Sequence, residues 1–204
     1  MIGIVDHRMG NLLSVFNAFE YMGADVELCA DPRDLDDADK IVLPGVGAFP
    51  DCMKNLKELG FQEVLNRLVL EEKRPVLGIC LGMQVMAEWG EEFGEHEGLG
   101  WIPGRVVRIK PEDPGLKVPH VGWNNIRYSP DSPLLKGLPQ SPDFYFVHSF
   151  HMECTDPGHV DAWCDYGGKV TAAVRRGNIF ATQFHPEKSQ DFGLKIIENF
   201  LSWH

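Results

Sequence analysis

The chain of 204 residues lacks the marks of secreted, membrane-spanning and zinc-binding proteins. Its five cysteines are an odd number and none forms a C-x-x-C pair, which argues against a disulfide framework and a zinc site. No run of about 18 apolar residues could span a membrane. The N-terminus, MIGIVDHRMGN, is typical of a strand and a polar turn, without the basic start and cleavage site of a signal peptide. We therefore expect a cytoplasmic protein that holds no metal.

Positive charge is also scarce. The chain has 19 Lys and Arg against 30 Asp and Glu, and its formal net charge of −11 disfavours binding to nucleic acid or to acidic membrane surfaces. A hydrophobic content of 44% and a charged content of 24% are ordinary for a soluble globular protein. This length suffices for one domain with a sizeable core, so we expect a single domain over residues 1–204.

Strand-like and helix-like segments alternate in the first half of the chain. The predicted strands are 1–5, 25–30, 40–43 and 76–79, and the predicted helices are 11–22, 51–59 and 61–72. Such alternation indicates right-handed crossovers and a parallel sheet, whose ligands sit at the carboxyl ends of the strands.

Short strands separated by turns are predicted after Gly90. They are 105–109, 118–126, 144–153, 161–164, 170–175 and 179–184, with a tight hairpin at Gly177-Asn178 and a closing helix over 189–203. We therefore predict an α/β fold with a central, mostly parallel mixed sheet flanked by helices.

The segment 75–88, PVLGICLGMQVMAE, has the pattern of a nucleophile elbow. A short apolar strand leads to Cys80, which lies between Gly78 and Gly82, and residues 83–87 favour a helix. Strand, glycine-flanked turn and helix are the setting in which hydrolases place a nucleophile. The same residues also fit a buried structural cysteine, and this segment alone leaves both readings open.

Two further segments could complete such a site. PGVG at 44–47 follows a strand, and its backbone N–H groups could hold an oxyanion. In His185-Pro186-Glu187, an extended proline would let the carboxylate orient the imidazole, giving a Cys-His-Glu relay. Alone, either segment is more often only a turn. Rival bases are His120, His148 and His151, of which only His151 has a carboxylate at matching spacing, Glu153.

Together, the motifs resemble those of class I glutamine amidotransferases, and the resemblance covers essentially the whole chain. LGICLGMQ, PGVGAF and TQFHPEKS carry it. Narrower matches resemble the glutaminase subunits of imidazole glycerol phosphate synthase, which belongs to histidine biosynthesis; they are MGN at 9–11, GLG at 98–100, IPGR at 102–105, VPHVGWN at 118–124, FVHS at 146–149, DYG at 165–167 and GN at 177–178.

The resemblance implies a glutaminase without a cofactor. Cys80 would attack the side-chain amide of L-glutamine, His185 would be base and then acid, and Glu187 would orient His185. The backbone N–H groups of Val46 and Leu81 would hold the oxyanion, and in this family the PGVG peptide can sit flipped away from the site. The implied glutamine-binding residues are Gly45, Gly47, Gln84, Glu92, Ser149 and Phe150.

The resemblance also implies a partner, a (β/α)₈ cyclase or synthase subunit that forms a heterodimer with the chain and receives its ammonia. The expected interface residues are His7, Arg8, Met9, Asn11 and Trp123. His7-Arg8 stands where the family usually has Tyr-Gly, which suggests an altered contact or a different partner. Three alternatives remain: a paralogue that supplies ammonia to a surface-sugar amidotransferase, a stand-alone thiol hydrolase or peptidase, and a non-catalytic binding module.

Overall fold

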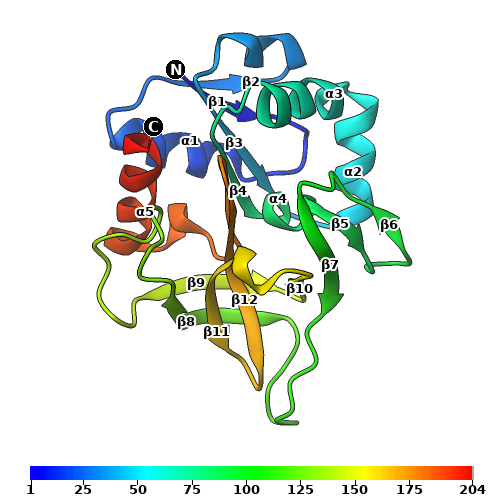
Figure 1. Ribbon diagram of the computed structural model, residues 1–204, viewed down its shortest axis with the longest axis vertical. Coiled ribbons are helices and arrows are strands. Elements are labelled where there is room, and N and C mark those ends of the chain that lie inside the picture. The colour runs from blue at the N-terminus through cyan, green and yellow to red at the C-terminus, as the bar shows by residue number, and fades with distance from the viewer. Residues whose placement is uncertain (204) are drawn as a thin grey trace.

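The larger of two sheets forms the centre of the fold in the computed structural model, which describes residues 1–203 (Figure 1). In this range it has nine strands in the order β2-β1-β3-β4-β13-β12-β11-β8-β9. Their bounds are β1 Ile2–Val5, β2 Val26–Cys29, β3 Lys40–Gly45, β4 Val76–Cys80, β8 His120–Tyr128, β9 Asp143–His148, β11 Val160–Asp165, β12 Lys169–Arg176 and β13 Ile179–Thr182.

This sheet is mixed, as the sequence predicts. The four neighbouring pairs from β2 to β13 are parallel, and the four from β13 to β9 are antiparallel. The antiparallel half begins at the predicted hairpin, where Arg176 pairs with Ile179 across Gly177-Asn178. Because β3, β4 and β13 run in the same direction, the segments that follow them meet at one edge of the sheet.

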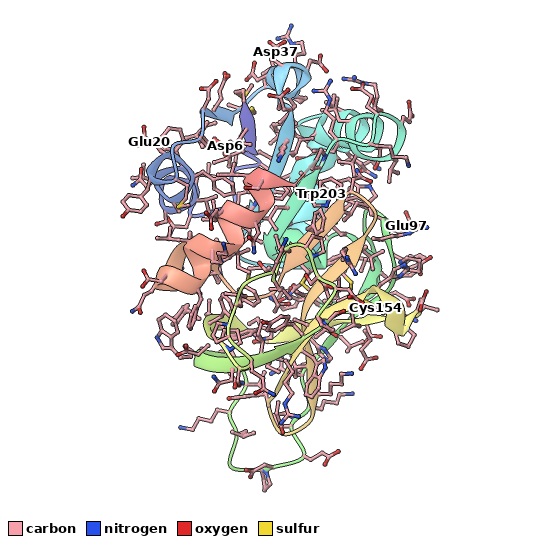
Figure 2. The ribbon with its side chains drawn as sticks, turned by 60° about the vertical axis from the view of Figure 1, so that its left-hand side comes forward. Asp6, Glu20, Asp37, Glu97, Cys154 and Trp203 are labelled. Carbon is pink, nitrogen blue, oxygen red and sulfur yellow. The ribbon has the colours of Figure 1, made fainter. Side chains whose placement is uncertain are left out.

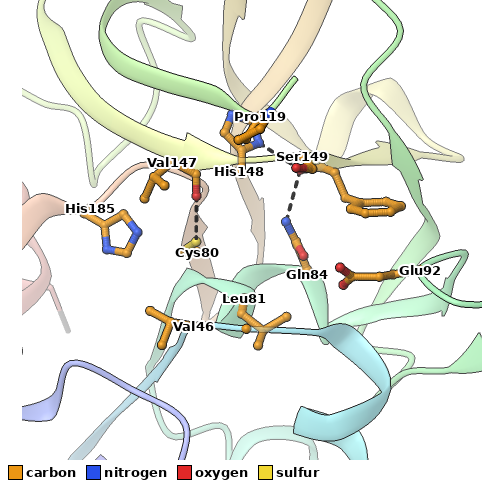
Figure 3. A pocket seen from close by; sticks show the side chains of 12 residues that line it. Val46, Cys80, Leu81, Gln84, Glu92, Pro119, Val147, His148, Ser149 and His185 are labelled. Atoms are coloured by element: carbon orange, nitrogen blue, oxygen red, sulfur yellow. Dashed lines mark hydrogen bonds between the residues drawn. The ribbon is translucent and has the colours of Figure 1, made fainter. Parts of the chain in front are cut away.

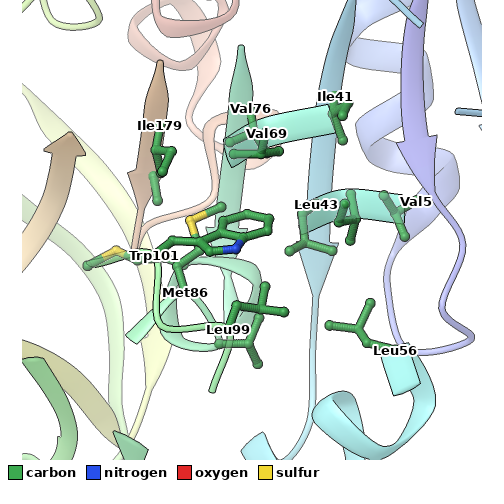
Figure 4. Packing of buried hydrophobic residues seen from close by; sticks show 14 of the residues in the cluster. Val5, Ile41, Leu43, Leu56, Val69, Val76, Met86, Leu99, Trp101 and Ile179 are labelled. Atoms are coloured by element: carbon green, nitrogen blue, oxygen red, sulfur yellow. The ribbon is translucent and has the colours of Figure 1, made fainter. Parts of the chain in front are cut away.

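Helices cover both faces of the parallel half. They are α1 Leu12–Tyr21, α2 Phe49–Glu58, α3 Phe61–Asn66, α4 Leu81–Gln84 and α5 Gln190–Ser202. The buried apolar side chains form two groups. Helices α2 and α3 pack with the first group, and helices α1 and α5 pack with the second. Figure 4 shows the first group, with Trp101 at its centre. No helix within residues 1–203 is long and apolar enough to cross a membrane.

The predicted helix over residues 83–87 is wrong in its extent. Helix α4 ends at Gln84 after about one turn, and strand β5 begins at Ala87. The backbone of this segment pairs with residues 98–102 instead, since Leu99 N donates to Val85 O and Ile102 N donates to Met86 O. A short apolar run fits a buried strand as well as a buried helix, and here the pairing partner decides.

Strand β5 belongs to a second, smaller sheet that the sequence did not reveal. Its order is β10-β7-β5-β6, with bounds β5 Ala87–Gly90, β6 His96–Glu97, β7 Ile102–Arg108 and β10 Phe150–Cys154. The single strand predicted over residues 144–153 is therefore two strands, β9 and β10, in different sheets. Ser149 separates them, and this break matters for the site described below.

Lys40, the first residue of β3, is buried at the carboxyl end of α5. Its Nζ donates to the carbonyl oxygens of Phe200, Leu201 and Trp203. Trp203 follows α5 and is labelled in Figure 2. Its ring packs edge-on against that of Phe180 in β13. The last carbonyls of a helix have no donors within the helix, and a cation there also meets the negative end of its dipole.

We expect Lys40→Met to lower the free energy of unfolding by about 2 kcal/mol, because it removes a charged donor from these carbonyls while keeping an apolar stem. Lys195→Met is a matched control, since Lys195 forms only an exposed ion pair with Glu198. Such a pair contributes roughly 0.5 kcal/mol. Urea denaturation of both variants measures the difference, and equal losses would contradict the role given to Lys40.

Candidate active site

Cys80 ends β4 and directly precedes α4, at a sharp turn. Its φ of +56° and ψ of −108° lie outside the regions that side-chain-bearing residues favour. Such strain is typical of functional positions. Gly82 makes the turn possible, because a Cβ there would lie 1.8 Å from the carbonyl oxygen of Leu43 in β3. These features match the strand, strained turn and helix of a nucleophile elbow.

Cys80 lies in a cavity of about 310 Å³ at the carboxyl ends of β3, β4 and β13 (Figure 3). Most of the residues that line the cavity were predicted from the sequence as site residues: Val46, Gly47, Cys80, Leu81, Gln84, Glu92, Ser149, Phe150 and His185. Pro119, Val147 and His148 also line it and were not predicted to. The break at Ser149 brings the β9–β10 junction across from Cys80.

Two predicted site residues lie just outside the cavity lining. Gly45 pairs in register with Cys80 at the end of β3. Glu187 accepts a hydrogen bond of 2.7 Å at Oε1 from Nδ1 of His185, and both side chains are buried. The expected extended conformation of Pro186 is wrong, because residues 186–188 form a 3₁₀ turn that brings the carboxylate back to the imidazole.

The Cys80 and Glu187 side chains set the charge of His185. Burial alone lowers the pKa of His185, but these two neighbours outweigh burial and raise it to about 9. A pKa raised in this way favours the doubly protonated imidazole at neutral pH. Since Nδ1 faces Glu187, the second proton sits on Nε2, which has no hydrogen-bond partner within residues 1–203.

His148 is a poor rival base although it lines the cavity. Its Nδ1 donates to the carbonyl oxygen of Phe150 at 2.8 Å, and its Nε2 lies 2.9 Å from Nδ1 of His120. Burial lowers the pKa of His148 to about 3 and that of His120 to about 4. Both rings are neutral, and both nitrogens of His148 are occupied. His151 contacts Glu153 only at 3.9 Å, and it does not line the cavity.

The glycine-rich turn at 44–47 presents its peptide away from the cavity. The Val46 N–H donates to the carbonyl oxygen of Met9 at 3.1 Å. This donor is therefore occupied, whereas a residue at the start of a helix, such as Leu81, has no acceptor for its N–H within the helix. Of the two expected oxyanion donors, the Val46 N–H is therefore already bonded within the chain, and the Leu81 N–H has no partner within its own helix.

Two predicted glutamine-binding side chains already have partners in the chain. Gln84 donates through Nε2 to the carbonyl oxygen of Phe150 at 3.1 Å and to Oε1 of Gln183 at 3.0 Å. Glu92 accepts at Oε2 from the first N–H of α2, that of Phe49, at 2.9 Å. The other carboxylate oxygen of Glu92 and the amide oxygen of Gln84 are the groups left to meet a ligand.

A comparison with known families identifies the family to which this fold belongs. The profile of "Glutamine amidotransferase class-I" matches residues 4–203. The chain belongs to the class I glutamine amidotransferase family. Solved structures agree on the fold: one titled "Crystal structure of glutamine amidotransferase" superposes with a TM-score of 0.75 at 21% identity, over 98% of each chain. "Structure of PurLQS from Thermotoga maritima" gives 0.75 at 17% identity, over 98% of this chain and 96% of that one.

Curated relatives within the amidotransferase family are much more similar in sequence. "Imidazole glycerol phosphate synthase subunit HisH 1" of Campylobacter jejuni (strain RM1221) is 53% identical over 98% of this chain and 99% of its own. "Imidazole glycerol phosphate synthase subunit HisH" of Mesorhizobium japonicum is 46% identical over 99% of this chain and 98% of its own. The match therefore extends over nearly the full length of these proteins.

The loop at 7–11 of this amidotransferase differs in part from expectation. The prediction that the His7 side chain contacts a partner is wrong, because this side chain is fully buried. Its Nε2 lies 2.6 Å from Pro44 O, and its Nδ1 lies 3.8 Å from Cys52 Sγ. Burial also lowers the pKa of His7. Arg8 is exposed at a φ of +67°, and only its backbone N–H bonds Asp6. Asn11 precedes α1 without a side-chain cap.

Exposed apolar side chains surround the cavity mouth of the amidotransferase. Val46 and Val147 line the cavity and are 40% and 37% exposed, and Val121 and Trp123 of β8 are 55% and 47% exposed. Val121 pairs with Val147, and Trp123 follows two residues later on the same face. We call these four residues the apolar rim.

The other four cysteines lie away from the cavity that contains Cys80. Burial raises the pKa of Cys29, Cys52 and Cys164 to about 12 and that of Cys154 to about 11. Cys154 is half-buried, and none of the four lines the cavity. Within residues 1–203, no three His, Cys, Asp or Glu side chains are arranged to hold a metal ion.

Gln183 was missed by the sequence reasoning although it lies beside the motif that carries His185. It is fully buried, and its Nε2 donates to Sγ of Cys80 at 3.6 Å. A polar side chain at a strand end, two residues before a candidate catalytic histidine, is the only sequence signal that could have indicated it.

Proposed function

We propose that this chain is the glutaminase subunit of an imidazole glycerol phosphate synthase. The observation that carries the proposal is a strained elbow cysteine that shares one cavity with a buried His185–Glu187 pair. The near full-length similarity to relatives with that printed name supports the pathway, histidine biosynthesis. A stand-alone thiol hydrolase fits less well, since it accounts neither for these relatives nor for the apolar rim.

In the proposed reaction, Sγ of Cys80 attacks the carbonyl carbon of the L-glutamine side-chain amide. The C–N bond breaks, and His185 Nε2–H gives its proton to the departing nitrogen, which leaves as ammonia. The pKa of about 9 supports this step, because His185 carries that proton at neutral pH. His185 then takes a proton from water, and the hydroxide attacks the glutamyl thioester. Glutamate leaves, and Cys80 is restored as thiolate.

Glu187 holds the imidazole so that Nε2 faces the cavity, and it stabilises the charged ring. Leu81 N–H is the proposed first oxyanion donor and Val46 N–H the second. Because Val46 N–H is bonded to Met9 O, the peptide must rotate before the site is complete. The Met9 carbonyl belongs to the 7–11 loop, so a protein that docks on this loop can control the rotation.

The proposed partner is a (β/α)₈ synthase subunit that covers the apolar rim and forms a heterodimer with the chain. Rims of exposed apolar side chains around a cavity mouth are typical of protein interfaces. Covering the mouth would let ammonia pass into the partner without meeting water. The partner would then use the ammonia to make imidazole glycerol phosphate and AICAR.

Arg8 provides a test of which partner fits. Within the described chain, 1–203, its guanidinium forms no ion pair, so docking has to supply an acceptor or leave a desolvated charge. We expect Arg8→Gly to weaken binding to the cognate synthase by about tenfold or more. A histidine-pathway synthase and a surface-sugar synthase are compared by isothermal titration calorimetry.

Lys73→Gly is the matched control, because Lys73 is also an exposed cation at positive φ, 60° against 67° for Arg8. It precedes β4 and so lies at the opposite edge of the sheet from the cavity. The Lys73→Gly variant is expected to bind either synthase with the affinity of the wild type. If the wild-type chain binds the surface-sugar synthase more tightly, the chain belongs to that pathway. If the wild type and Arg8→Gly each bind both synthases with equal affinity, Arg8 does not determine which partner is bound.

A further inference from the structure

The amide of Gln183 lies between the sulfur of Cys80 and the amide of Gln84. Its Nε2 is 3.6 Å from Cys80 Sγ, and its Oε1 accepts from Gln84 Nε2 at 3.0 Å. The side chain is fully buried, and its backbone N–H donates to Ala172 O of β12 at 2.8 Å. The bond to β12 therefore fixes the backbone of Gln183 beside two residues that line the cavity, Cys80 and Gln84.

The carbonyl oxygen of Phe150 fixes the direction of the hydrogen bonds that link Gln84, Gln183 and Cys80. Phe150 O can only accept, and it receives His148 Nδ1–H at 2.8 Å and Gln84 Nε2–H at 3.1 Å. The amide nitrogen of Gln84 must therefore face both Phe150 O and Gln183. Gln183 then has to present its oxygen to Gln84, because a flipped amide would set two NH₂ groups against each other. Its nitrogen is thereby committed to the sulfur of Cys80.

We propose that Gln183 is a catalytic residue that donates its amide N–H to the Cys80 thiolate and favours that form over the thiol; this rests on the proposed function of Cys80. Hydrogen bonds from a neutral donor to an ion are among the stronger ones, and burial excludes competing water. As a thiol, the sulfur donates only a long hydrogen bond of 3.9 Å to the carbonyl oxygen of Val147, whereas the Gln183 N–H lies closer to it, at 3.6 Å. When the sulfur forms a thioester it loses its charge, and this hydrogen bond weakens with it.

The test measures alkylation of Cys80 by iodoacetamide as a function of pH, followed by mass spectrometry of the peptide that contains Cys80. The thiolate is the reactive form, so the midpoint of this profile reports how readily the sulfur loses its proton. Gln183→Met keeps the length of the side chain and removes the donor. We expect its midpoint to rise by about 1 pH unit, the size expected for loss of one hydrogen bond to a charged group.

Thr182→Val is the control, because Thr182 is the buried neighbour of Gln183 at the end of β13 and its hydroxyl donates to Phe184 O at 3.0 Å rather than to the sulfur. Its midpoint should equal that of the wild type. Gln183→Glu is the second variant, should the methionine variant not fold; it keeps an acceptor for Gln84 but cannot donate to the sulfur when ionised, and its midpoint should also rise. A folded Gln183 variant with the wild-type midpoint overturns the proposal, as does an equal rise in Thr182→Val.

Alkylation needs no glutamine, so this experiment is independent of the substrate. A wild-type protein that fails to hydrolyse glutamine with its partner would overturn the proposed function and leave the measured midpoints unaffected.

Discussion

Cys80→Ala is expected to lower glutamine hydrolysis by about 10⁴-fold or more, the usual cost of removing the nucleophile of a catalytic triad. No other thiol can replace it, since the remaining cysteines lie outside the cavity and are protonated at neutral pH. The variant should still support the synthase reaction when ammonium salt is added, because only the ammonia source is lost. Glutamate formation and synthase product are measured separately.

His185→Ala should be nearly as severe, and the double variant no worse than the worse single one, because nucleophile and base act as one unit. Glu187→Ala should be milder, since the carboxylate orients and stabilises the ring but forms no bond with substrate. Cys154→Ala is the control and should retain wild-type activity. Near-normal glutamine hydrolysis by Cys80→Ala would exclude the mechanism, and additive losses in the double variant would give His185 a separate role.

The second large effect is expected from the partner. The isolated chain should hydrolyse glutamine slowly, and adding the (β/α)₈ subunit with its ligand should raise kcat by about 10² to 10³, the contribution of one oxyanion donor. KM should change far less, because the Val46 N–H would meet charge that develops only in the transition state. The physical reason is the Val46–Met9 hydrogen bond, which occupies that donor in the free chain.

Steady-state kinetics of the chain alone, with partner, and with partner plus ligand separate kcat from KM. Hydrogen exchange of the Val46 amide gives a second measurement, since loss of its bond to Met9 O should reduce its protection in the activated complex. Turnover by the isolated chain at the rate of the complex would contradict control through this peptide.

Local pattern marked the elbow and the histidine–carboxylate pair as candidates, and the family resemblance then favoured the catalytic reading of both. Buried strands that alternate with helices must end at one edge of a parallel sheet, so the residues after β3, β4 and β13 were bound to meet there. Turn chemistry likewise fixed the Gly177-Asn178 hairpin. The fold class follows from these local rules, whereas most of the cavity lining was predicted from the family resemblance.

Features that depend on long-range pairing could not be predicted in this way. Strand β5 over Ala87–Gly90 replaces the expected helix because the carbonyls of residues 85–88 accept hydrogen bonds from residues 98–102. The break at Ser149 depends on a second sheet whose short strands carry no pattern of their own. Burial of His7 depends on the approach of α2, and the role of Gln183 depends on Gln84 and Phe150, which are distant in sequence.

Only one of the five cysteines, Cys80, lines the cavity, and this has a practical consequence. We expect an electrophile that resembles glutamine to react with Cys80 and with no other cysteine, because Cys80 lines the cavity and the other four cysteines do not. The amount of electrophile bound per chain would then report the fraction of molecules in which Cys80 is reactive. Reporter groups can be placed in the cavity, at the face where a partner would dock, without changing any residue of the chain.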